Sequence, residues 1–99
     1  MRPNHIEQLL LNWDRKDLLC RAELRYFDPK SKWECFIYAI NPSDEDEMKC
    51  FITGEESTIE EWKFSEMAKL YNQDGESPII DLNFRPRSLA TILTLKRNQ

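Results

Sequence analysis

Eight acidic residues lie close together in the middle of the sequence, and they are the side chains with the clearest potential for chemistry. Residues 44–61 contain these eight acids and one lysine, whereas the rest of the chain is slightly basic. Neighbouring carboxylates can act as general acids and bases, bind a divalent metal, or attract a basic surface of another protein. The acids are Asp44, Glu45, Asp46, Glu47, Glu55, Glu56, Glu60 and Glu61.

The acidic segment lacks the additional residues that catalysis or metal binding needs. The run 44–47 has neither the glycine nor the distal glutamate of a calcium loop. His5 is the only histidine, and near the terminus it is a poor general base. The only two glycines, Gly54 and Gly75, are too few for a phosphate-binding loop. We therefore expect a protein that is not an enzyme and that binds no metal or cofactor.

Three cysteines, Cys20, Cys35 and Cys50, recur at intervals of fifteen residues. If the strands form a meander with turns near residues 30 and 45, Cys20 and Cys50 lie on one sheet face, two strand spacings or roughly 10 Å apart. Cys35 then falls on the opposite face, so the three thiols cannot surround a zinc ion. We expect reduced, buried cysteines that serve as packing residues.

Four arginines offer an alternative, a surface for nucleic acid. Arg21 and Arg25 stand on a predicted strand close to Phe27 and Trp33, and arginine beside aromatic rings is typical of single-strand binding. Arg85 and Arg87 add a second basic segment. The formal net charge of −4 opposes this function, because a negative protein repels phosphate at long range.

Hydrophobic periodicity divides the chain into helices and strands. Spacings of three and four residues predict helices over 5–14 and 66–72 and a third after Pro86. Apolar and polar residues alternate over 18–27 and 79–84 and weakly over 58–64, which predicts strands there. Two further strands are predicted between turn segments, the richly apolar 33–40 and the segment 48–53 that ends at Gly54. The order α-β-β-β-β-α-β-α predicts one α+β domain over 1–99, with a four- to five-stranded antiparallel meander packed on two to three helices.

The predicted register decides which residues form the core. It places one set on the buried sheet face: Ala22, Leu24, Tyr26, Phe36, Tyr38, Ile40, Cys50 and Ile52. The reverse face carries Phe27, Trp33, Cys35, Ile37 and Phe51, which is too apolar to stay exposed. A helix covers this face in the favoured interpretation, and the alternative is a homodimer through Trp33, Ile37 and Phe51.

The location of the protein follows from two further patterns. No apolar run approaches the roughly 20 residues that span a bilayer, which argues against membrane insertion. The N-terminal residues lack the apolar core of a signal peptide. We therefore expect a cytoplasmic protein.

Several short motifs between residues 26 and 89 follow one another in a definite order and spacing: Phe27-Asp28-Pro29, Trp33, Phe51, Gly54, Phe64-Ser65-Glu66, Asp81 and Phe84-Arg85-Pro86. In this order and spacing the segment resembles a bacterial family known only as domain of unknown function 2958. Cys50 and Met67 depart from it, since the family has an aromatic residue and a leucine there. The resemblance implies a phage or mobile-element origin and no particular activity.

Three functions are consistent with these patterns. We favour a non-enzymatic module that binds the basic surface of a protein partner through its acidic residues, with Trp33 and Phe51 as anchors. In a phage or mobile element, such a module would inhibit or modulate a host nucleic-acid or defence enzyme. The alternatives are a nucleic-acid-associated accessory protein that uses the four arginines, and a structural domain without a ligand whose acids only keep an edge strand soluble.

Overall fold

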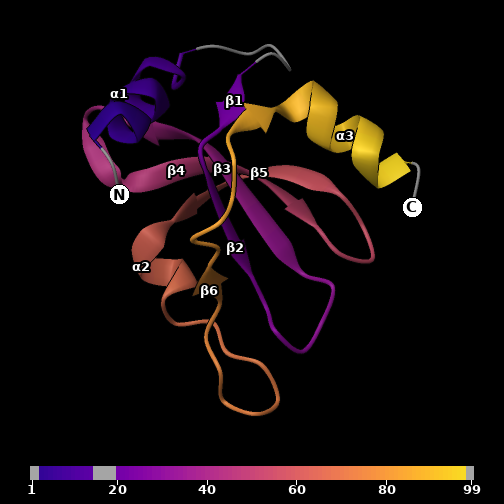
Figure 1. The fold of residues 1–99 in the computed structure, drawn as a ribbon. Coiled ribbons are helices and arrows are strands. Elements are labelled where there is room, and N and C mark those ends of the chain that lie inside the picture. Colours follow the sequence, from indigo (N-terminus) through magenta and orange to yellow (C-terminus); the bar gives the residue numbers. More distant parts are fainter. Residues whose placement is uncertain (1–2, 15–19, 98–99) are drawn as a thin grey trace.

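Five antiparallel strands form the main sheet in the computed structural model, which describes residues 3–14 and 20–97. The strand order is β5-β4-β3-β2-β6, so four consecutive strands make the predicted meander and β6 joins its far edge (Figure 1). These strands are β2 (Leu24–Phe27), β3 (Glu34–Asn41), β4 (Asp44–Thr53), β5 (Thr58–Lys63) and β6 (Ile79–Ile80). The predicted α+β class is confirmed.

A second, two-stranded sheet and three helices complete the described structure. Strand β1 (Arg21–Ala22) pairs antiparallel with β7 (Arg87–Ser88), which brings the C-terminal segment back beside the start of the meander. The helices are α1 (Pro3–Leu11), α2 (Phe64–Met67) and α3 (Leu89–Arg97). The predicted order of elements holds with two exceptions: the first predicted strand is divided into β1 and β2, and the short strand β7 before α3 was not predicted. Residues 18–19 of the first predicted strand lie outside the described residues.

The register of the first hairpin differs from the prediction by one residue. Leu24 pairs with Ile37, and Tyr26 pairs with Cys35. The turn sets this register, because the Asp28 N–H donates to the Trp33 carbonyl oxygen at 3.1 Å and so fixes where the hairpin closes. Side chains alternate along a strand, so a shift of one residue separates residues that were predicted to share a face: Phe36 and Tyr38 lie on the face opposite Leu24.

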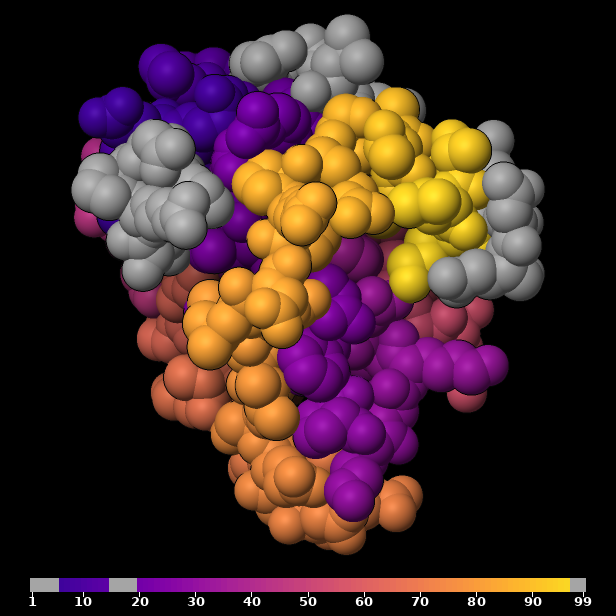
Figure 2. Space-filling model, viewed as in Figure 1, coloured from indigo at the N-terminus to yellow at the C-terminus, as the bar shows by residue number. Residues whose placement is uncertain are grey.

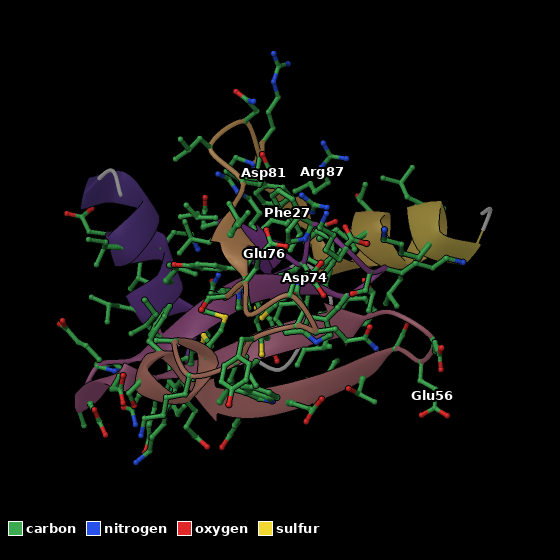
Figure 3. All side chains as sticks on the ribbon, turned by 90° about the horizontal axis from the view of Figure 1, so that it is seen from below. Phe27, Glu56, Asp74, Glu76, Asp81 and Arg87 are labelled. Carbon is green, nitrogen blue, oxygen red and sulfur yellow. The ribbon has the colours of Figure 1, made fainter. Side chains whose placement is uncertain are left out.

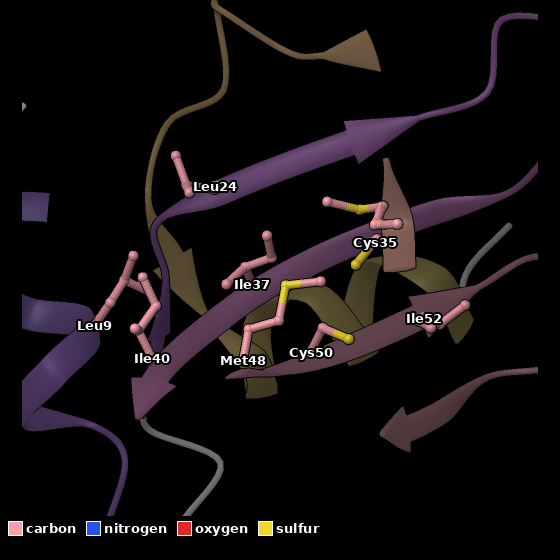
Figure 4. Close-up of a cluster of buried hydrophobic side chains, with 9 residues drawn as sticks. Leu9, Leu24, Cys35, Ile37, Ile40, Met48, Cys50 and Ile52 are labelled. Atoms are coloured by element: carbon pink, nitrogen blue, oxygen red, sulfur yellow. The ribbon is translucent and has the colours of Figure 1, made fainter. Parts of the chain in front are cut away.

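One face of the sheet packs against α1 and α2. Figure 4 shows this core, in which the thiols of Cys35 and Cys50 lie near Met48. The prediction that Cys35 lies opposite Cys50 is therefore wrong, because the register places them on the same face. Hydrogen bonding with Cys50, together with burial, raises the pKa of the Cys35 thiol. The buried members of this cluster are Leu9, Leu24, Cys35, Ile37, Ile40, Met48, Cys50, Ile52 and Met67.

The opposite face is covered as well, which confirms the favoured interpretation. Leu89 and Ile92 of α3 pack on this face, and the cluster also contains Cys20, Ala22, Phe36, Tyr38, Ala39 and Phe51. Cys20 and Cys50 therefore lie on different faces, contrary to the prediction. Ile37 and Phe51 are buried in different clusters, so they cannot form one exposed dimer surface with Trp33.

Two predicted elements are shorter than expected. Only residues 66–67 of the predicted helix 66–72 are helical, and they form the end of the four-residue α2. The predicted strand 79–84 ends at Ile80. The strand ends because Asp81 turns the chain: its carboxylate accepts from the Asn83 N–H at 3.0 Å, and its carbonyl oxygen accepts from the Phe84 N–H at 3.3 Å. An Asp side chain that bonds the backbone two residues later favours a turn over a strand.

This turn sends the C-terminal segment across the sheet. Figure 2 shows the orange and yellow segment lying over the purple first strands, with α3 at its end. The Phe84 ring packs against Phe36 with the ring centroids 5.8 Å apart, and the Leu89 N–H donates to the Cys20 carbonyl oxygen at 3.0 Å. These contacts fix the position of α3 relative to the sheet.

Candidate functional site

The structure places the eight acids in two groups along β4 and β5. Asp44, Glu45, Asp46 and Glu47 form the first part of β4, which begins four residues before the predicted strand 48–53. Glu55 and Glu56 lie in the turn between β4 and β5, and Glu60 and Glu61 lie on β5 itself. We call Glu55, Glu56, Glu60 and Glu61 the acidic edge, because β5 is the outermost strand of the sheet.

Two acids of the first group have structural roles. Asp46 accepts from the Ser65 N–H at 3.0 Å and from the Ser65 hydroxyl at 2.6 Å, so it holds the start of α2 against β4. These bonds lower the pKa of Asp46. Glu47 accepts from the Asn41 side chain at 2.9 Å. These two carboxylates stabilise the fold and are less suited to bind a partner than their neighbours.

The acidic edge is more exposed and makes fewer internal bonds. Glu60 accepts from the Thr58 hydroxyl at 2.7 Å and from the Trp62 indole N–H at 3.2 Å. The side chains of Glu55, Glu56 and Glu61 are exposed and make no hydrogen bond or ion pair with any other described residue. Figure 3 shows Glu56 at the tip of the β4–β5 hairpin, where it extends away from the body of the molecule.

The two predicted aromatic anchors occupy different positions. Phe51 is buried between the sheet and α3 and cannot contact a partner in this fold. Trp33 is half-buried and packs against the other core. The apolar residue that is exposed at the acidic edge is Ile59, which is 54% exposed in the middle of β5.

Three of the four arginines line one cavity, and Arg21 is not among its lining residues. Arg21, on β1, forms an ion pair at 3.1 Å with Glu23, the residue that follows β1. Arg25 pairs with Glu34 at 2.9 Å and with Asp81 at 3.0 Å, so its charge is already compensated. Arg85 and Arg87 are exposed and pair with no carboxylate among the described residues, and together with Arg25 they line one cavity.

Sequence reasoning missed the centre of this cavity, which is Glu34. Its carboxylate accepts from Arg25, from the Thr53 hydroxyl at 3.1 Å and from the Lys96 ammonium. Burial alone would raise the pKa of Glu34, but the bonds from Lys96 and Arg25 outweigh it, and the pKa is lowered. An acid at the start of an otherwise apolar strand was the available signal. Nothing in the sequence indicated that Lys96 is its partner.

No group of three or more His, Cys, Asp or Glu side chains in the described parts of the chain is arranged to hold a metal ion. In the same residues, no helix is long and apolar enough to cross a membrane.

Comparison with models of protein families, with curated proteins and with solved structures gives no match for this chain.

Proposed function

We propose that this protein is a non-enzymatic binding module that attaches to a basic protein surface through its acidic edge. The observation that carries the proposal is the combination of an outermost strand and unpaired carboxylates. Strand β5 pairs only with β4 among the described strands, so one side of its backbone remains available for a further strand. Three carboxylates along this strand and its turn have no cationic partner in the described residues.

Strand addition explains how affinity and specificity would arise together. A partner strand beside β5 would gain main-chain hydrogen bonds, and its Lys or Arg side chains would lie about 5 Å from the carboxylates opposite them. Ile59 would supply apolar contact at the centre of the interface. The excess of carboxylates would also increase the rate of encounter with a basic partner.

The same charges argue against two other occupants. A second copy of the chain would bring its own acids against the acidic edge, and directly opposed like charges destabilise strand pairing. Nucleic acid would meet the same repulsion through its phosphates. An enzyme that handles nucleic acid has the complementary basic surface, and we propose a host enzyme of that class as the partner, in line with the resemblance of residues 26–89 to a phage and mobile-element family.

Charge reversal tests this proposal if the folded structure is left intact. Reversal of Asp46 or Glu47 would disturb the bonds described above, so the test uses Glu55→Lys, Glu56→Lys and Glu61→Lys in one chain. The control chain carries Glu7→Lys, Asp74→Lys and Glu76→Lys, which changes the net charge equally, from −4 to +2. Figure 3 shows Asp74 and Glu76 well separated from Glu56.

The readout is affinity capture from a nuclease-treated bacterial lysate, followed by mass spectrometry of the proteins retained after a salt wash. A stoichiometric protein retained by the wild type and the control chain, but lost from the edge variant, would support the proposal. Equal retention by all three chains would refute it and leave the carboxylates as protection of an exposed strand. If the tagged wild type retains no protein from the lysate, the result also counts against a protein-binding module.

A further inference from the structure

A cavity of about 290 Å³ lies between α3, the segment that follows β6, and strands β2 and β3. In Figure 2 it belongs to the region where yellow α3 overhangs the purple strands. Phe36 forms part of its floor, and Phe84, Ile92 and Leu95 contribute apolar wall. Leu95 is 47% exposed although it stands beside charged groups, so the cavity offers both apolar surface and charge.

The charges that line this cavity are predominantly positive in an otherwise acidic protein. Its lining contains four cations, Arg25, Arg85, Arg87 and Lys96, and two carboxylates, Glu34 and Asp81. The formal excess is therefore +2, whereas the whole chain carries −4. Both carboxylates are occupied, because Glu34 accepts from Arg25 and Lys96 and Asp81 accepts from Arg25.

The cations nevertheless retain donors for a ligand. Arg25 uses Nε and Nη1 in its ion pairs, and neither of these bonds involves Nη2. The Arg87 guanidinium lies 5.9 Å from the centre of the Phe84 ring, and its Nε donates only a long bond of 3.4 Å to the Arg85 carbonyl oxygen. Figure 3 shows Arg87 and Asp81 close together on one side of the molecule. Guanidinium groups bind phosphate oxygens through paired hydrogen bonds.

We propose that this cavity binds a small organic phosphate with an aromatic body. A phosphate monoester carries a charge near −2 at neutral pH, which matches the formal excess in the cavity. The volume holds about ten non-hydrogen atoms, since a water molecule takes about 30 Å³ in the liquid. An aromatic body would pack against Phe84 and Leu95, and the phosphate would lie beside Arg85 and Arg87.

A neighbouring groove extends the site. Its volume is about 710 Å³, and it shares Arg25, Glu34 and Lys96 with the first cavity. The aryl phosphate could therefore be a free molecule or a phosphotyrosine side chain whose peptide follows the groove. Both present the same aryl phosphate to the cavity.

Titration with phenyl phosphate, followed by amide NMR at low salt in a buffer without phosphate, tests the proposal. We expect shifts at Phe84, Arg85 and Lys96, and a Kd at least tenfold below those of inorganic phosphate and phenol measured separately. Arg85→Ala with Arg87→Ala should weaken binding about tenfold or more, because bonds to charged groups are being removed. Lys63→Ala with Lys69→Ala is the matched control, and it should bind like the wild type.

Three results would overturn the site: no shifts around the cavity, inorganic phosphate binding as tightly as phenyl phosphate, or an arginine variant that binds like the wild type. Arg85→Lys with Arg87→Lys should recover part of the affinity, which separates a role in binding from a change in the fold. A phosphotyrosine tripeptide identifies the source. Binding more than tenfold tighter than phenyl phosphate would support a phosphotyrosine peptide, and equal affinities would support the free molecule.

Discussion

Replacement of Glu34 with glutamine should destabilise the protein by about 2 kcal/mol. The carboxylate accepts three hydrogen bonds, two of them from cations, and the side chain is only 15% exposed. Removal of one partner from a fully buried ion pair costs about 3–5 kcal/mol, and an exposed pair contributes about 0–1 kcal/mol. Glu34 lies between these limits, since Arg25 and Lys96 both retain some contact with solvent.

The size of this effect makes it easy to measure. For a domain of about 100 residues, 1 kcal/mol corresponds to roughly 4–8 °C in Tm, so Glu34→Gln should melt about 8–16 °C below the wild type. Thermal and urea unfolding followed by circular dichroism give the difference. Glu45→Gln is the control, because Glu45 is an exposed acid on β4, and it should change the unfolding free energy by less than about 0.5 kcal/mol.

The pH dependence of unfolding tests whether the loss of the Glu34 charge causes the destabilisation of this variant. The pKa of Glu34 is lowered in the folded protein from an ordinary value of 4.5. Its ionised form therefore contributes stability above the unfolded pKa, and this contribution is lost as the pH falls through the folded pKa. The difference between wild type and Glu34→Gln should be constant above about pH 6 and should shrink below about pH 4.5. A variant that melts within 2 °C of the wild type at pH 7 would refute the reasoning.

Two other predictions concern the core. Leu9→Ala should cost about 2–5 kcal/mol in urea unfolding, because Leu9 is fully buried against the sheet, while Leu11→Ala on the same helix should be nearly neutral because Leu11 is 71% exposed. Similar costs for both variants would contradict the packing of α1. The three buried thiols should not react with a thiol reagent at pH 8 until urea unfolds the chain, since the reagent cannot reach sulfur atoms inside the core. Rapid labelling of the native protein would contradict their placement.

The sequence was sufficient to predict the type and order of the elements but not the register of the sheet. The apolar content of β3 and β4 and the turn residues before them identify strands regardless of which residues face each other, so the strand assignments did not depend on the register. The pairing of Leu24 with Ile37 depends on how the turn from Asp28 to Trp33 closes. The shared face of Cys35 and Cys50 depends on the second hairpin, where Ile37 pairs with Cys50, whereas a turn centred near residue 45 would have paired Ile40 with it; spacing alone could not reveal this.

The acidic edge could be predicted from the sequence, whereas the cavity could not. The acids at Glu55, Glu56 and Glu61 were identified from local composition, and local composition also placed them together because they lie on one hairpin. The cavity was missed because its cations come from distant segments: Lys96 reaches Glu34 across 62 positions, and Arg25 reaches Asp81 across 56. Such contacts depend on the path of the segment after β6, which the turn at Asp81 determines.

Glu55 connects the acidic edge to the proposed phosphate site, because it lines the groove that shares Arg25 and Lys96 with the cavity. Its carboxylate should therefore oppose phosphate binding. At 0.1 M salt, where screening acts over about 10 Å, Glu55→Lys should tighten phenyl phosphate binding about threefold for a charge separation on the order of 10 Å.

The control for this effect is Asp74→Lys, which changes the net charge equally but lies on the loop between α2 and β6. At 0.1 M salt it should leave the affinity unchanged, and at 0.01 M salt, where screening extends to about 30 Å, both variants should tighten binding. Equal affinities of both variants at 0.1 M would mean that Glu55 does not act on the cavity. A local effect of Glu55 would mean that a basic partner on the acidic edge favours the phosphate, and by reciprocity that the phosphate favours the partner.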